Sequence, residues 1–320
     1  MPRPIVNAKL LPVLLGLWLL AGTGCTTLKH TAVNQVGNAL AEGGSTFASD
    51  DDPELVRAAS PFSLKLIESL LVETPDHRGL RLAAARGFTQ YAYVFLEQDA
   101  DLMADQDYAG ASLLRSRARK LYLRARDHGL RGLETTHPDF LRQLRANPLT
   151  AVRAAVVADV PLLYWTAASW AAAITLSKDN ADLIADLVLV EALMDRALEL
   201  NERYDAGAIH TFLITYEMSR RGAPGAPADR ARRHFDRAME LNQGTQVGPL
   251  VSLAEAVMVV QQNRAEFTSL LQRALVLDPA AQPESRLANT IMQRRARWLL
   301  SRTDELFLPE AALPAPTDKL

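Results

Sequence analysis

A six-residue pattern that recurs at helix ends constrains the fold more than any other feature of this sequence. The pattern reads Arg-Ala, an apolar residue, Glu or Val, Leu, and then Asn or Asp, and it begins at Arg196, Arg237 and Arg273. The spacings of 41 and 36 residues are close to the period of about 34 residues that is typical of a helix–turn–helix repeat. The recurrence therefore predicts stacked helical hairpins.

A second signal in the same region points to the tetratricopeptide type of repeat. The second helix of that repeat carries a small residue, an aromatic residue four positions later and a small residue three positions after that, because small residues let helices approach closely while the ring fills the groove between hairpins. Single triplets arise by chance in Ala-rich helices, but four at near-regular spacing favour degenerate repeats. The two complete and two partial matches are Ala118-Tyr122-Ala125, Ala231-Phe235-Ala238, Val190-Met194-Ala197 and Phe267-Leu271-Ala274.

Helical periodicity fills the middle of the chain, and no alternating run of β-branched residues indicates a sheet. We expect an all-α fold, a tetratricopeptide-like array of helical hairpins wound into an α-α superhelix, with extra helices near 137–158. The predicted helices span 53–73, 78–103, 107–129, 137–145, 149–158, 161–178, 181–200, 204–220, 227–241, 249–262, 264–277 and 284–306.

The N-terminus has the layout of an export signal. Arg3 and Lys9 precede an apolar run from Leu10 to Leu20, which ends in small residues before Cys25, the single cysteine of the chain. The run is shorter than the about 20 residues that cross a bilayer, and the arrangement is typical of a secretory signal peptide. We predict a lipoprotein signal over 1–24 and a lipid anchor on Cys25, although Gly22 stands where such signals usually carry Leu. A simple cleaved signal with a stray thiol is the alternative.

The remaining domain boundaries follow from composition. Residues 25–52 are polar and contain Gly37, Gly43 and Gly44, which is typical of a flexible tether, and residues 307–320 hold three prolines without periodicity and are expected to be disordered. The helical-repeat domain spans 53–306. The formal charge is −2, and removal of 1–24 makes it more negative by two, so nucleic acid is an unsuitable partner.

The sequence offers little for catalysis, and we expect no enzyme, no cofactor and no metal site. The six histidines include no pair at the spacing of four that would place two ligands on one helix face. Phosphate-binding glycine loops and nucleophile elbows are missing as well. Asp50-Asp51-Asp52 has no following glutamate in a calcium loop and is interpreted as a solvated run that caps the next helix.

Two segments carry more aromatic residues than packing alone needs, and both fall on predicted first helices of repeats. They contain Tyr91 in 87–95 and Tyr164, Trp165 and Trp170 in 162–170. Such helices face the concave side of a tetratricopeptide array, so these four residues are the candidate groove residues for a ligand or a partner. Trp165 and Trp170 lie about 140° apart around a helix, so both cannot face the same way, and we expect one to face the core and the other the groove. Burial of most of these rings in the core is the alternative.

The same segments resemble a known family, the T-component (TatT) lipoproteins of TRAP transporters. The resemblance extends over about 50–300 and implies a periplasmic helical-repeat lipoprotein that works beside a TRAP-type solute-binding protein, forms homotrimers and encloses an apolar cavity or pore. TRAP systems as a class favour organic acids. The residues that carry the resemblance are Asp52–Val56, Pro61–Leu71, Gly87–Tyr91, Arg124–Gly132, Leu163–Trp165, Trp170 and Leu176–Asp179.

Two functions follow as hypotheses. One is an accessory component of TRAP-type solute uptake that binds a solute-binding protein, or an apolar or organic-acid ligand, in a groove or pore. The alternative is a tetratricopeptide lipoprotein scaffold for envelope or outer-membrane assembly. Both place the chain on the periplasmic side of a bacterial membrane, and Thr26 after the cysteine, rather than Asp, favours the outer membrane over the inner one.

Overall fold

The computed structural model describes residues 35, 37–39 and 44–309, and these form helices joined by turns and loops, with no strand among them. The predicted signal peptide, Cys25 and most of the tail lie outside the described residues. Part of the expected tether is helical, since α2 spans Gly44–Ala48. The first long helix, α3, spans Pro53–Glu73 and begins as predicted, because the Asp52 carboxylate accepts hydrogen bonds from the backbone N–H groups of Glu54 and Leu55.

The next predicted helix, 78–103, is continuous but changes its winding in the middle. It comprises α4 (Arg78–Ala92), the π-helical turn η1 (Tyr93–Glu97) and α5 (Gln98–Met103). A second π-helical turn, η4 (Ala254–Met258), follows α14 (Gly248–Leu253). Turns of this kind are rare and occur frequently at functional sites. Each of these two π-helical turns contributes a side chain to one polar cluster.

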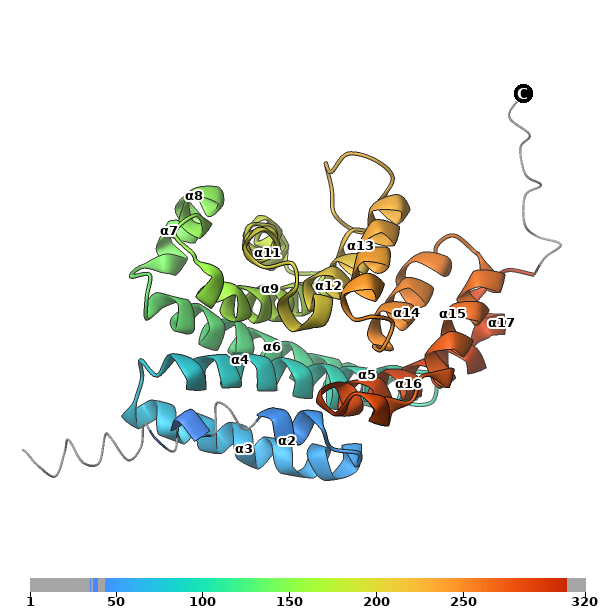
Figure 1. The fold of residues 1–320 in the computed structure, drawn as a ribbon, viewed down its shortest axis with the longest axis horizontal. Coiled ribbons are helices and arrows are strands. Elements are labelled where there is room, and N and C mark those ends of the chain that lie inside the picture. Colours follow the sequence, from blue (N-terminus) through green and yellow to red (C-terminus); the bar gives the residue numbers. More distant parts are fainter. Residues whose placement is uncertain (1–34, 36, 40–43, 310–320) are drawn as a thin grey trace, which may run out of the picture.

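The core of the molecule is the stack of α4, α6 (Tyr108–Glu134) and α9 (Val160–Thr175), which contact one another in the middle of Figure 1. Two glycines allow α6 and α9 to approach closely. A Cβ atom on Gly129 would lie 2.1 Å from the Thr166 hydroxyl, and one on Gly132 would lie 2.7 Å from the Leu162 side chain. The Gly129–Gly132 segment is therefore a packing feature of α6.

The remaining helices continue the array in chain order. Successive pairs contact each other, namely α9 with α11, α12 with α13, and α14 with α15. Their bounds are α7 (Phe140–Ala146), α8 (Pro148–Val152), η2 (Val157–Asp159), α10 (Ala181–Ala185), α11 (Leu187–Leu200), η3 (Tyr204–Gly207), α12 (Ala208–Tyr216), α13 (Pro227–Leu241), α15 (Arg264–Val276), η5 (Pro279–Ala281), η6 (Pro283–Ser285), α16 (Arg286–Ser301) and α17 (Thr303–Leu306).

All four predicted triplets are buried. Every one of their residues is at most 6% exposed, and Phe235 is the most exposed of the twelve. Burial of both small residues and the larger residue between them is what close packing of helical hairpins requires. The all-α class is confirmed, while the tetratricopeptide-like order of the hairpins stays a prediction.

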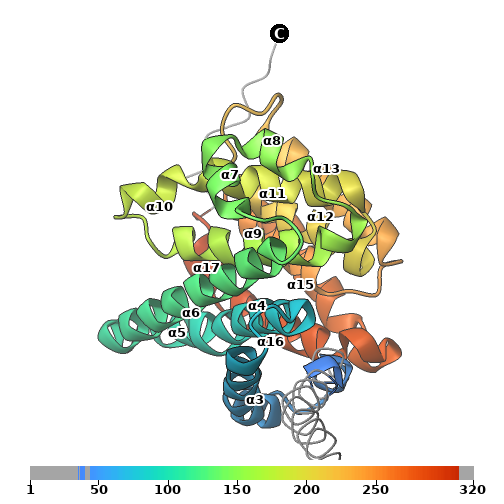
Figure 2. The same ribbon diagram turned by 90° about the vertical axis from the view of Figure 1, so that its left-hand side faces the viewer.

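The end of the array returns to its beginning. Figure 1 places α16 beside α5, and α16 also contacts α2 and α3, although it is almost the last helix of the chain. Figure 2 shows the same arrangement from the side. Arg295 of α16 donates a hydrogen bond of 2.9 Å to Asp101 of α5, and Arg294 pairs with Glu54 of α3. The helices therefore form a closed array rather than an open solenoid.

One described segment, Val157–Thr175, is long and apolar enough to cross a membrane by length and composition. It consists of η2 and α9, and 61% of its apolar window is buried inside the molecule. Burial by α4, α6 and α11 accounts for that apolar composition, as in the core helix of a helical protein.

Candidate ligand or partner site

Two of the four candidate groove residues meet in one aromatic cluster. On α9, the Tyr164 and Trp165 rings are 5.0 Å apart in an edge-to-face arrangement, and the Tyr204 ring of η3 lies 5.4 Å from Tyr164. The indole N–H of Trp165 donates a hydrogen bond of 3.2 Å to the Tyr204 hydroxyl. Tyr164 and Tyr204 remain partly exposed, whereas Trp165 is only 9% exposed. We call Tyr164, Trp165 and Tyr204 the three-ring cluster.

The backbone that follows Tyr204 is strained. Asp205, Ala206 and Gly207 have φ values of 46°, 50° and 92°, which makes three consecutive residues left-handed. A single left-handed non-glycine residue costs of the order of 1–3 kcal/mol, and Ala has no side-chain polar group to offset that cost. Strain of this kind persists only where surrounding contacts hold it. It commonly occurs beside ligand sites.

Two opposite charges flank the three-ring cluster. Asp205 is exposed, yet burial raises the pKa of its carboxyl, with the positive charge of Arg86 on α4 opposing the shift. Burial likewise raises the pKa of Tyr204 to about 12, reinforced by the Asp205 charge. Within the described residues, neither Arg86 nor Asp205 makes an ion pair or a side-chain hydrogen bond.

The other two candidate residues lie elsewhere. Trp170 is fully buried, with the Arg126 guanidinium 5.1 Å from its ring centre, and so it belongs to the core. Tyr91 is partly buried between α4 and α6, where its ring lies 5.5 Å from that of Phe95. The structure thus brings Tyr164 and Trp165 together and places Tyr91 and Trp170 apart from them.

A second polar cluster lies where the array closes, and we call it the seam. Arg295 binds both Asp101 and Glu255, and its guanidinium carbon lies 4.2 Å from the centre of the Trp298 ring. The two π-helical turns contribute to this cluster, since Glu255 belongs to η4 and Tyr93 to η1. The Tyr93 hydroxyl lies 4.0 Å from the Met292 sulfur of α16. Arg295 itself keeps only 10% of its side chain exposed.

Buried polar groups continue from the seam into α5 and α6. The Tyr122 hydroxyl donates a hydrogen bond of 2.6 Å to Glu97, and burial raises the pKa of that carboxyl. Gln98 is 5% exposed, and its side-chain nitrogen has no acceptor among the described residues. It borders a cavity of about 10 Å³ beside Arg295 and Trp298, a volume that suits about one water molecule.

A further depression is lined by residues of neither cluster. It has a volume of about 470 Å³, and its lining contains no aromatic residue and includes Arg264 and Asp304, which pair with each other. The three-ring cluster, in contrast, combines apolar area with unpaired charge. That combination makes it the stronger candidate for a site that recognises another molecule.

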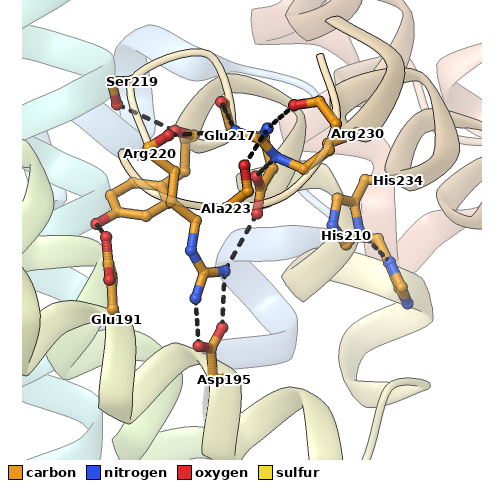
Figure 3. A network of polar contacts seen from close by, with 11 residues as sticks. Glu191, Asp195, His210, Glu217, Ser219, Arg220, Ala223, Arg230 and His234 are labelled. Atoms are coloured by element: carbon orange, nitrogen blue, oxygen red, sulfur yellow. Dashed lines mark hydrogen bonds and ion pairs between the residues drawn. The ribbon is translucent and has the colours of Figure 1, made fainter. Parts of the chain in front are cut away.

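A third polar network fixes α12 and α13 against α11. Figure 3 shows Arg220 reaching Asp195 of α11, and His210 beside His234. The two imidazole Nδ1 atoms are 2.8 Å apart, so one ring must donate and the other accept. Burial and the neighbouring His210 lower the pKa of His234 to about 4. Within the described residues, no group of three or more His, Cys, Asp or Glu side chains could hold a metal ion.

Comparison with known proteins decides the family. Residues 49–307, nearly the whole described part of the chain, match the TRAP transporter T-component family. The chain belongs to that family. A TRAP T-component is an accessory component of a TRAP transporter, so this chain is assigned to a membrane-associated solute-uptake system rather than to a known enzyme family.

A relative of this T-component is found in a spirochaete. An uncharacterized protein of Treponema pallidum (strain Nichols) is 30% identical over 266 residues, which covers 82% of each chain. The family match confirms the resemblance to TRAP transporter T-components that the sequence indicated.

Sequence reasoning missed three residues of the T-component site. Tyr204 and Asp205 fall in a segment predicted as the start of a helix over 204–220, and Arg86 is one of many arginines on an amphipathic helix. Gly207 was the available signal, because a glycine at a helix start permits a left-handed residue there. No pattern in the sequence shows that η3 lies against α9.

Proposed function

We propose that this T-component is a periplasmic lipoprotein, anchored through Cys25, that presents the three-ring cluster to a TRAP-type solute-binding protein or to the ligand it carries. The single observation that carries this proposal is the cluster itself. Within a family that serves solute uptake, it combines two partly exposed tyrosines with a nearly buried tryptophan that holds one of them in place.

Aromatic rings suit a recognition surface for a physical reason. They offer large apolar area with few rotatable bonds to immobilise, so binding them costs little conformational entropy. The Trp165–Tyr204 hydrogen bond and the left-handed turn restrict these rings further before any ligand arrives. A preorganised surface of this kind favours specific binding.

Self-association as a homotrimer is part of the proposal. Leu55 and Phe62 are 58% and 74% exposed, and with the half-buried Leu66 they follow one face of α3. An apolar stripe on an outer helix supports an interface between copies of the chain. Light scattering of the purified chain, compared with a Phe62→Glu variant, tests this element on its own.

The experiment on the proposed site measures capture of the solute-binding protein. Tyr164→Ala and Tyr204→Ala remove the partly exposed rings, and Trp165→Phe keeps the buried bulk while removing the indole N–H. Tyr108→Ala is the matched control, because Tyr108 is 75% exposed on α6 and lies outside the cluster.

We expect the two alanine variants to weaken capture by about tenfold or more, Trp165→Phe to weaken it less, and the control to bind normally. Circular dichroism must show unchanged helicity for each variant. Normal capture by both folded alanine variants would contradict the proposed site. Loss of the fold in both would show that the rings are core residues.

A further inference from the structure

The solvent-exposed face of α6 concentrates positive charge in a chain that is acidic as a whole. Residues 115–131 include seven Lys or Arg and one acidic residue, whereas the formal net charge of the chain is −2. From position 113 to position 131, the exposed residues recur at spacings of three and four, so they share one face of the helix. They are Leu113, Arg117, Lys120, Arg124, Asp127 and Arg131. We call the four cations among them the basic stripe.

Most of the charge of the basic stripe has no negative partner. Arg124 pairs with Glu68 of α3, and the carboxylate of Asp127 is bound at 2.7 Å by the neighbouring Arg126. Among the residues that the structure describes, no ion pair or side-chain hydrogen bond reaches the other three members, which are Arg117, Lys120 and Arg131. Like charges three or four positions apart on a helix repel each other. A negatively charged partner would relieve that repulsion.

The shape of the basic stripe suits a lipid surface better than a protein. Because α6 is one continuous helix of 27 residues, the stripe extends in a straight line over about 21 Å. No aromatic residue interrupts this face between Arg117 and Arg131, whereas protein interfaces draw most of their affinity from buried aromatic or apolar anchors. Long Lys and Arg side chains instead reach charged headgroups from an apolar stem.

The basic stripe also lies beside the helix through which the chain enters the array. Glu68, the partner of Arg124, belongs to α3, which begins at Pro53. The chain is a component of a membrane-associated transport system, and its predicted tether leads into α3. A flexible tether limits the distance of the array from the membrane but leaves its orientation free. A second contact beside α3 removes that freedom.

We propose that the basic stripe binds the anionic phospholipid headgroups of the membrane surface and so orients the array with α6 toward the bilayer. Each Lys or Arg near an anionic membrane surface strengthens binding about fivefold, so the three unpaired cations contribute about 100-fold together. Binding of this kind is separate from the proposed function, because it involves neither the three-ring cluster nor the solute-binding protein.

The test measures binding to lipid vesicles. It uses the mature chain, residues 25–320 with Cys25→Ser, which keeps every described residue and carries no lipid tail that could insert by itself. One set of vesicles contains phosphatidylcholine alone, and the other contains phosphatidylcholine mixed with anionic phosphatidylglycerol. We expect the chain to sediment with the mixed vesicles only, and we expect this binding to weaken as salt is added, because ions screen exposed charges.

Two triple variants remove equal charge from different places. The first replaces the three unpaired members of the basic stripe: Arg117→Gln, Lys120→Gln and Arg131→Gln. The second is the matched control and acts on exposed arginines of α13, α15 and α16 that have no ion pair within the described residues: Arg233→Gln, Arg273→Gln and Arg297→Gln. Affinity for the mixed vesicles should fall by about 100-fold in the first variant. The control should bind as the wild type does, since distant charges are screened.

A third variant keeps the charge of the basic stripe and exchanges the groups that carry it: Arg117→Lys, Lys120→Arg and Arg131→Lys. It should bind the mixed vesicles as the wild type does, because attraction to a fluid layer of headgroups depends on charge rather than on the planar donor geometry of arginine. Circular dichroism must show unchanged helicity for all three variants.

Three results would overturn the inference: no preference of the wild type for the mixed vesicles, equal losses in the two glutamine variants, or loss of binding in the charge-keeping variant. Capture of the solute-binding protein is measured on the same preparations. If the glutamine variant of the basic stripe binds vesicles normally and loses capture, the stripe is a protein interface and the inference fails. If the variants of the three-ring cluster leave capture unchanged, the proposed function fails while the vesicle result stands.

Discussion

Arg295 and Asp101 are 194 positions apart in the chain and form an ion pair of 2.9 Å that joins α16 to α5. The C-terminal apolar core, built from α12 to α17, contains no residue of α3, α4 or α5. Polar contacts at the seam therefore contribute to closure of the array. Arg302 adds a further pair there, with Asp105 at 2.6 Å.

The first prediction concerns Arg295. Its replacement by Gln leaves Asp101 and Glu255 without their shared cation, and removal of one partner from a largely buried pair costs about 3–5 kcal/mol. Arg294→Gln is the control, because the pair between Arg294 and Glu54 is exposed and such pairs are worth about 0–1 kcal/mol. Urea unfolding measures the loss of stability in both variants. Equal, small losses for the two variants would show that the seam contributes little to the closed array.

The second prediction concerns the repeat triplets. Phe235→Ala should lower the free energy of unfolding by about 3–5 kcal/mol because it opens a cavity, and Ala231→Leu by about 1–3 kcal/mol because it forces α13 away from its neighbour. Leu113→Ala, at a site 73% exposed on α6, should have little effect. Thermal melting of the three variants decides the matter, and unchanged melting of the first two would refute the packing role of this triplet.

The third prediction concerns pH. The pKa of His234 falls from its ordinary 6.5 to about 4 in the fold, so the unfolded chain binds the proton more readily between these values. Stability from the neutral ring is thus fully present above about pH 6.5 and is lost as the pH falls toward 4. In the His234→Gln variant, the free energy of unfolding should vary less with pH over this range. Above pH 7 its pH profile should run parallel to that of the wild type. Parallel profiles throughout would show that His234 titrates normally.

The fourth prediction concerns the anchor. Cys25→Ser should leave an unprocessed precursor or a soluble periplasmic species, because the thioether to the diacylglycerol cannot form. Metabolic labelling with a fatty acid, together with membrane fractionation, measures this. A variant that loses its signal peptide and still stays with the membrane would disprove the lipoprotein prediction.

The sequence predicted most helices because their periodicity and caps are local. The bounds of α3 and α13 agree with the predicted 53–73 and 227–241, where Asp52 caps one helix and a proline opens each. The prediction missed the break between α10 and α11, the left-handed turn over Asp205–Gly207 and both π-helical turns. These features depend on tertiary contacts rather than on local propensity.

The candidate site was predictable only in part for the same reason. The aromatic content of 162–170 drew attention to Tyr164 and Trp165, which do lie in one cluster. Periodicity alone could not tell that Trp170 would be fully buried. The contribution of Tyr204 requires that α9 and η3 meet in space, and a single sequence carries no signal for that contact.

The most direct test of the account is crosslinking in intact cells. A photoreactive amino acid in place of Tyr204 would capture whatever contacts the three-ring cluster, and the same substitution at Tyr108 on α6 provides the control. Mass spectrometry should identify a TRAP-type solute-binding protein at Tyr204 and not at Tyr108. Capture of outer-membrane assembly factors at Tyr204, with no solute-binding protein, would contradict a role in solute uptake and support the scaffold alternative.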